Sequence, residues 1–333
     1  MATGPRPFRL FILLLLVGGA ITYYLAYRPK SSAAYIAKLK DPDATTRHQA
    51  SDALVQVGAP AVPQLIDSLQ DEAVRPLAID ILHQIGPDAI EAVSALSHFV
   101  DQGKGSHRAA VIAALGAIGS PESISVLSEA LEDDAPAVRA KAVVALGRID
   151  PVDDTVVAAL TRVIADSAVR LSVIATLGQI GPQAEDAVPT LIEALQASND
   201  AAASERIAWA LGQIGPDAEQ AVPTLIDAMG GDDYLVRARA AAALGNIGPQ
   251  AKEAVPALIE AVKSTPGNPD GGFRGQDWAF ARNATAALGK IGPDARDAVA
   301  ALTDALEHGD EDVREYAGIS LRQIDPAWTA AVE

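Results

Sequence analysis

Apolar residues recur at steps of three and four along most of this chain, which is the spacing of one face of an α-helix. In residues 233–262, one such stripe covers residues 236–247 and a second covers residues 255–262. Asp233 is suited to cap the first helix, and Gly248 can end it in the left-handed conformation. The segment therefore predicts two amphipathic helices joined by a Gly-Pro turn.

This two-helix pattern repeats along the chain, and a leucine near the end of each first helix marks the copies. These repeat leucines are Leu54, Leu82, Leu115, Leu146, Leu177, Leu211, Leu244, Leu288 and Leu321. A helical repeat of about 30 residues indicates a solenoid, because one pair cannot bury its own apolar stripe and must stack on its neighbours. We expect an all-α fold without strands, in which nine first helices alternate with eight second helices.

The repeat has a recognisable motif, A-x-A-L-G-x-I-G-P followed by A-V-P-x-L-I-x-A-L, as in AAALGNIGP at residues 241–249. This motif resembles HEAT repeats, and more closely the short HEAT-like repeats of phycobilin lyases. The resemblance covers residues 43–326 and implies an α-α superhelix of about eight to nine helix pairs. It is specific for the fold and weak for function, because such repeats serve scaffolds, lyases and hydroxylases alike.

The N-terminal region differs from the repeats. Residues 10–27 contain no charged residue, and at about 1.5 Å per residue they are long enough to cross a membrane. After a short segment, 1–9, we expect a single-pass anchor with the solenoid outside the cytoplasm, then a linker with a capping helix at 28–42. The alternatives are a cleaved signal peptide, leaving a secreted or periplasmic protein, and a buried solenoid helix. Residues 327–333 form a C-terminal tail.

One repeat contains an insertion, residues 263–277, which is rich in glycine and proline. Insertions in solenoids fall on one face and often contribute to binding. Phe273, Arg274 and Trp278 are residue types that anchor interfaces. The alternative is a tolerated surface loop, with Trp278 packed in the following helix.

One charged position also repeats, seven residues before the repeat leucine. It holds Arg47, Arg75, Arg108, Arg139, Arg170, Arg237 and Arg314. Several of these arginines follow an aspartate by four residues, which suggests a structural ladder in which the aspartate caps a helix and the arginine binds a carboxylate or carbonyl of the adjacent layer. A row of phosphate-binding arginines is the alternative, and the nearby aspartates argue against it.

Motifs for catalysis are missing from the sequence. There is no cysteine, and no histidine lies in a His-Glu pair of the kind that holds iron in HEAT-like hydroxylases. No phosphate-binding loop, G-x-S-x-G or zinc spacing is present, so we expect a protein without enzymatic activity, cofactor or metal. The net charge of −17 also makes nucleic-acid binding unfavourable and favours a basic protein partner.

Acidic residues recur on the predicted second helices. Each lies two positions after the leucine that recurs in these helices. They are Asp67, Glu129, Glu193, Asp227, Glu260 and Asp304. The resemblance to HEAT solenoids implies that second helices line the concave side, so these residues would form a negative strip there. The alternative is an ordinary solvated face of amphipathic helices.

Two functions follow from these observations. The first is a membrane-anchored, non-catalytic scaffold that binds a protein partner with a basic segment through the acidic strip. The second, which the resemblance to phycobilin lyases implies, is a lyase-type or chaperone-like accessory enzyme.

Overall fold

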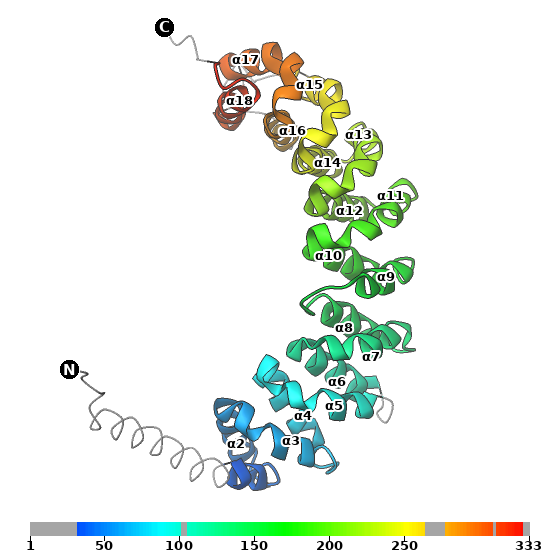
Figure 1. The fold of residues 1–333 in the computed structure, drawn as a ribbon, viewed down its shortest axis with the longest axis vertical. Helices are drawn as coiled ribbons and strands as arrows, with labels where there is room; N and C mark the ends of the chain where they lie inside the picture. Colours follow the sequence, from blue (N-terminus) through cyan, green and yellow to red (C-terminus); the bar gives the residue numbers. More distant parts are fainter. Residues whose placement is uncertain (1–31, 101–104, 264–276, 309–310, 329–333) are drawn as a thin grey trace, which may run out of the picture. The chain divides into compact units, whose positions relative to one another are not determined.

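The computed structural model describes residues 32–100, 105–263, 277–308 and 311–328. The chain divides into two compact units, unit 1 (Met1–Asp150) and unit 2 (Pro151–Glu333), shown in Figure 1. In the described residues both units consist of α-helices and short 3-10 helices, without strands. The all-α prediction is therefore confirmed for this part of the chain.

Unit 1 alternates first and second helices after a short helical stretch at residues 32–38. Its first helices are α2 (Ala44–Val57), α4 (Arg75–Ile85), α6 (Gly105–Ile118) and α8 (Pro136–Leu146). Its second helices are α3 (Val62–Ser68), α5 (Val93–Val100) and α7 (Ile124–Glu129). Its 3-10 helices are η1 (Ala59–Ala61), η2 (Gly86–Ala92), η3 (Pro121–Ser123) and η4 (Ala130–Glu132).

Unit 2 continues the same alternation, beginning with a second helix. Its first helices are α10 (Arg170–Ile180), α12 (Ala201–Ile214), α14 (Tyr234–Ile247), α16 (Asp277–Ile291) and α18 (Glu311–Ile324). Its second helices are α9 (Asp154–Arg162), α11 (Val188–Gln196), α13 (Val222–Met229), α15 (Val255–Lys263) and α17 (Val299–His308). Its 3-10 helices are η5 (Gly181–Ala187), η6 (Gly215–Ala221), η7 (Gly248–Ala254) and η8 (Gly292–Ala298). The predicted alternation of first and second helices is confirmed.

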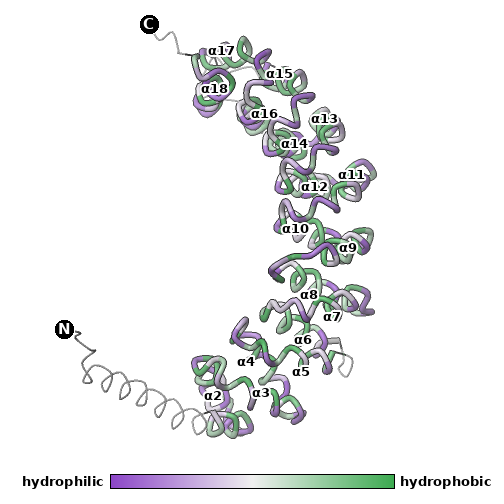
Figure 2. The backbone as a smooth tube through the Cα atoms, in the orientation of Figure 1, coloured by the Kyte–Doolittle hydropathy of each residue, from purple (hydrophilic) through white to green (hydrophobic). Residues whose placement is uncertain are grey.

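The pair α14–α15 shows why these residues form helices. The carboxylate of Asp233 accepts hydrogen bonds from the backbone N–H groups of Leu235 and Val236, as expected of a cap. Gly248 ends α14 with φ 76° and ψ −139°, so its φ is positive but it lies outside the predicted left-handed helical region. The chain then makes the 3-10 helix η7, where the sequence predicts only a Gly-Pro turn. Figure 2 shows polar and apolar residues alternating along the helices, as amphipathic helices require.

Successive first helices approach one another very closely, because glycine follows several of the repeat leucines. A Cβ atom on Gly245 would lie 2.8 Å from the Cα atom of Ala287 in the next first helix, and one on Gly212 would lie 2.8 Å from the Cα atom of Ala243. The repeat leucine beside this contact, Leu244, is fully buried. Small residues thus let the backbones of the first helices pack directly against each other.

In unit 2 this close packing determines which row of helices is on the inside of the curve. In Figure 1, α10, α12, α14, α16 and α18 follow the inner side of the curve of unit 2, and the second helices follow its outer side. Neighbouring first helices are in extensive contact, whereas neighbouring second helices touch little. The prediction that second helices line the concave side is therefore wrong for unit 2.

The boundary between the two units falls where one repeat lacks its stop glycine. The predicted solenoid, residues 43–326, spans this boundary. In most repeats a glycine with positive φ lies four residues after the repeat leucine, as Gly119 does in the repeat before the boundary. After Leu146 that position holds Asp150, and α8 ends at the leucine itself.

The predicted N-terminal anchor, residues 10–27, lies outside the described residues, and so do residues 264–276 of the predicted insertion. Within the described ranges, no helix is both long enough and apolar enough to cross a membrane.

Candidate protein-interaction surface

Four of the seven repeated arginines bind the backbone that leads into their own helix. Arg139 donates from Nη1 to the carbonyl oxygens of Asp133 at 2.7 Å and Asp134 at 3.3 Å. Arg170 makes the same pair of bonds to Ile164 and Ala165, at 3.2 and 3.1 Å. Arg47 and Arg75 likewise reach the carbonyls six and five residues before them. Carbonyl groups after a helix have no partner within it, and a guanidinium supplies one.

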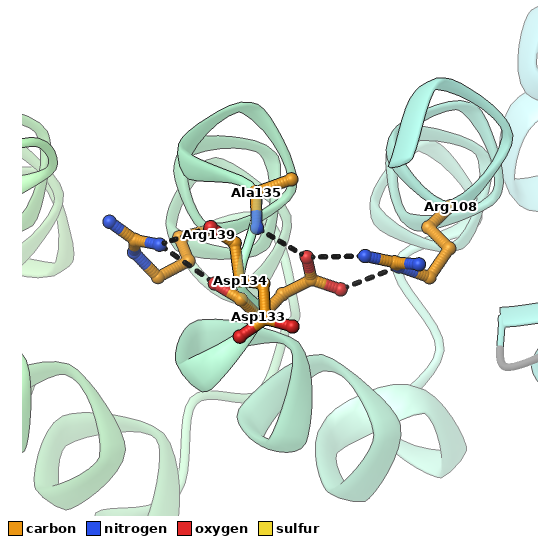
Figure 3. Close-up of polar contacts among 5 residues, drawn as sticks. All are labelled: Arg108, Asp133, Asp134, Ala135 and Arg139. Atoms are coloured by element: carbon orange, nitrogen blue, oxygen red, sulfur yellow. Dashed lines mark hydrogen bonds and ion pairs between the residues drawn. The ribbon is translucent and has the colours of Figure 1, made fainter. Parts of the chain in front are cut away.

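Arg108 uses the same register position differently, as Figure 3 shows. Its Nε and Nη2 atoms donate to the two carboxylate oxygens of Asp133 in the next repeat, at 2.6 and 2.8 Å. Asp133 also accepts a bond from the backbone N–H of Ala135 at 2.8 Å. The hydrogen bonds from Arg108, followed by that from Ala135, hold the pKa of Asp133 below its ordinary value. Arg108 therefore links two successive repeats, whereas Arg139 binds within one connection.

The remaining two arginines of the set lie in unit 2. The guanidinium of Arg237 lies over the ring of Phe280, with 5.1 Å between its Cζ atom and the ring centroid. Arg314 is exposed on α18. The predicted layer-to-layer bond is thus seen in Arg108, while the carbonyl bonds of Arg47, Arg75, Arg139 and Arg170 are made to the connection immediately before each helix.

The six repeated acidic residues are all exposed on second helices or at their ends. Asp67 and Glu129 belong to unit 1. Unit 2 brings together the other four, Glu193, Asp227, Glu260 and Asp304, on the consecutive helices α11, α13, α15 and α17. We call these four residues the acidic row. Because second helices follow the outer side of unit 2, the acidic row is on the convex side, which corrects the predicted concave strip.

Three of the four turns that lead into the same second helices, η5, η6 and η8, add net negative charge, whereas in η7 Lys252 balances Glu253. Exposed carboxylates occur in each of the 3-10 helices η5 to η8, at Glu185, Asp186, Asp217, Glu219, Glu253, Asp294 and Asp297. Among the four residues of the row, Glu260 pairs with Lys263 at 3.2 Å. That pair is exposed and screened by solvent, so it neutralises the row only weakly.

The residues proposed around the insertion are only partly described. Phe273 and Arg274 lie outside the described residues. Trp278, near the start of α16, has 37% of its surface exposed. The guanidinium of Arg282 lies 4.8 Å from its ring centroid, a cation–π contact within one helix. Trp278 is therefore neither fully buried nor free of contacts.

The described residues also bear on metal binding. Within the described ranges, no three His, Cys, Asp or Glu side chains lie close enough together to hold a metal ion.

The alternating helix pairs define an α-solenoid protein. A family model for HEAT repeats matches residues 95–168, 130–205, 164–233 and 188–269, which together make up more than half of the chain. The chain therefore belongs to the HEAT-repeat family. No curated protein matches its sequence.

Solved structures add similarities of fold. An engineered protein of known crystal structure matches with a TM-score of 0.51 and 21% identity, over 88% of both chains. A chain of the CpcE–CpcF complex of phycocyanin lyase from Nostoc sp. PCC7120 matches with 24% identity and a TM-score of 0.38, over 44% of this chain and 98% of that chain. A structure from a study of the interaction between cadherin and beta-catenin matches with 14% identity and a TM-score of 0.47, over 88% of this chain and 68% of that chain. Of the three, the engineered protein has a TM-score above 0.5, and it shows a similarity of fold alone.

Proposed function

We propose that this chain is a non-catalytic scaffold that binds a basic segment of a protein partner through the acidic row of unit 2. The observation that carries the proposal is the exposure of a carboxylate at the same register on α11, α13, α15 and α17. HEAT-repeat solenoids are commonly protein-interaction scaffolds, which agrees with this role.

The spacing of the row suits an extended basic segment. Closely packed helices such as the first helices lie about 8–10 Å apart, and the second helices on the outer side of the curve are spread at least as far, which is at or beyond the screening length of about 8 Å at physiological salt. Mutual repulsion within the row is therefore small. A basic segment running along the row would meet one carboxylate per layer, and the turn carboxylates would add long-range attraction that speeds association.

Charge reversal at three sites of the row tests the proposal. The partner would first be captured from solubilised membranes, and its binding then measured with purified proteins across a series of salt concentrations. The variant Glu193→Lys, Asp227→Lys, Glu260→Lys should bind at least about tenfold more weakly, with a flatter salt dependence. The matched control Asp52→Lys, Asp80→Lys, Asp88→Lys makes the same charge change at exposed sites of unit 1 and should bind as the wild type does.

Two results would contradict the proposal. Unchanged partner binding by the triple variant would mean that the row is an ordinary solvated surface. A chromophore that copurifies with the chain would instead favour the lyase-type or chaperone-like accessory role.

We also propose that residues 10–27 anchor the scaffold in a membrane with the solenoid outside the cytoplasm. The support is the uncharged apolar run in the sequence, followed by three tyrosines of the kind found at membrane interfaces. After carbonate extraction, the full chain should remain in the membrane fraction. Mass determination of a soluble product that begins near Ile21 would show signal cleavage instead.

A further inference from the structure

The arginine register is interrupted in unit 2. Seven of the nine repeats have arginine seven residues before the repeat leucine, and the other two have Ser204 before Leu211 and Ala281 before Leu288. Ser204 is only 8% exposed, and its Oγ atom lies 3.0 Å from both the Oγ atom of Ser198 and the carbonyl oxygen of Asp200. A short side chain thus replaces a long cationic one at a position that is well enclosed by its surroundings.

The carbonyl groups that an arginine would bind are present in this repeat. Counting back six and five residues from Ser204, as for Arg139 and Arg170, gives Ser198 and Asn199. No described residue donates a hydrogen bond to the carbonyl oxygen of either one. The repeat therefore keeps the acceptors of the arginine site while it lacks the arginine.

A cleft of about 570 Å³ occupies the place of the missing side chain. Ser198, Asn199 and Ser204 line one part of it, and Asp227 and Asp232 line another. Neither Asp227 nor Asp232 pairs with a cation among the described residues. The cleft therefore combines free carbonyls with two unneutralised carboxylates, which are the acceptors a guanidinium uses.

Unit 1 contains the corresponding cleft with an arginine in it. That cleft measures about 320 Å³ and is lined by Arg108 at the register of Ser204, and by Glu129 and Asp134 at the registers of Asp227 and Asp232. Its guanidinium makes the two-bond contact with Asp133 described above, drawn in Figure 3. The chain thus shows a guanidinium bound beside a cleft at this register. The carboxylate that binds it, Asp133, corresponds to Gly231 in unit 2, so a guanidinium in the Ser204 cleft would use Asp227, Asp232 and the two carbonyls instead.

We infer that the Ser204 cleft binds the guanidinium of an arginine side chain supplied by the protein partner. The arginine would supply in trans the guanidinium that seven other repeats carry at this register. A planar guanidinium can donate to two carbonyls and a carboxylate together, whereas an ammonium group cannot match this fork, so arginine should be preferred to lysine. The inference rests on the proposed function only in taking the partner to be basic.

The inference can be tested on the full chain without the partner. The probes are N-acetyl-arginine amide, N-acetyl-lysine amide and the uncharged isostere N-acetyl-citrulline amide, with binding followed by saturation-transfer NMR. Wild-type protein should bind the arginine probe at least about tenfold more tightly than the citrulline probe, and more tightly than the lysine probe. Equal binding of arginine and citrulline probes would overturn the inference.

Variants locate the site. Ser204→Arg should fill the cleft and reduce binding of the arginine probe at least about tenfold. Gln213→Arg, an exposed position on the same helix, adds the same charge elsewhere and should leave binding unchanged. Asp232 lines the cleft but does not belong to the acidic row. Asp232→Asn should therefore weaken arginine binding severalfold. This second variant decides the test if Ser204→Arg does not fold.

The outcomes separate this inference from the proposed function. Arginine binding that survives both Ser204→Arg and Asp232→Asn would place the probe elsewhere and refute the inference. Such a result would leave the acidic row to be judged by its own triple variant, because the probe assay involves no partner.

Discussion

The first and second helices of unit 2 use the same repeat in opposite ways. First helices meet through glycine and alanine, so closely that a single methyl group has no room at Gly245. Second helices barely touch their neighbours and carry exposed carboxylates at a repeated position. The inner row therefore holds the structure and its curvature, while the outer row is free to carry exposed charge.

The largest effect is expected at the inner contacts. Gly245→Ala should lower the free energy of unfolding by about 2 kcal/mol, since overpacking against the backbone of Ala287 costs up to about 3 kcal/mol and the gain in helix propensity returns about 1 kcal/mol. Urea denaturation followed by circular dichroism measures the change.

Gly318→Ala is the matched control for that substitution. Gly318 also lies within a first helix, but a Cβ atom there would meet its nearest neighbour, Leu306 Cδ1, at an ordinary 3.6 Å. The same change should therefore stabilise unit 2 by about 0.5–1 kcal/mol. If both variants shifted stability in the same direction, close contact would not be what distinguishes the first helices.

A smaller effect is expected where an arginine links two repeats. Arg108→Ala should cost about 1.5 kcal/mol at pH 7, because it leaves the carboxylate of Asp133 without its charged partner. The folded-state pKa of Asp133 is lowered, so this stabilisation is present above the unfolded pKa of about 3.9 and is lost as pH falls through the folded pKa. Urea denaturation at pH 7 and pH 3 should show the difference from wild type shrinking at the lower pH. A difference independent of pH would mean that Arg108 stabilises by packing alone.

Arg139 should contribute less, because it binds carbonyls within one connection. Arg139→Ala is expected to lower the free energy of unfolding by about 1 kcal/mol, within a range of about 0.5–2 kcal/mol for such bonds. Lys141→Ala removes the same charge from an exposed position on the same helix and should change stability little. Unchanged stability of Arg139→Ala together with lost partner binding would instead assign this arginine to recognition.

The sequence was sufficient to predict the fold because its pattern is local and repeated. Apolar spacing predicts each helix, and a capping residue such as Asp233 predicts where a helix begins. The recurrence of Leu244 and its equivalents predicts that the helix pairs stack. The direction of curvature could not be read from the family resemblance. The signal was nevertheless present, in the glycine that directly follows each of several repeat leucines.

The candidate sites were harder to predict because they depend on departures from the repeat. The arginine register and its interruption at Ser204 are both visible in the sequence, but the sequence does not show what lies in the space that an arginine would fill. Only three-dimensional packing shows that a cleft opens there beside Asp227 and Asp232. In the same way, the boundary between the units falls where Asp150 replaces the stop glycine. A comparison that looks only for matches to the repeat motif does not detect such a difference.

The smallest effect on stability is expected in the outer row. Glu193→Lys should change the free energy of unfolding by less than about 0.5 kcal/mol, because the side chain is exposed and neighbouring second helices barely touch. Relief of repulsion in a chain of net charge −17 acts in the stabilising direction and helps to keep the change small. Urea denaturation of this variant and of the triple variant of the row measures the effect. A loss above about 1 kcal/mol per site would show that the row is structural, and weaker partner binding by the triple variant could then not be attributed to its surface charge.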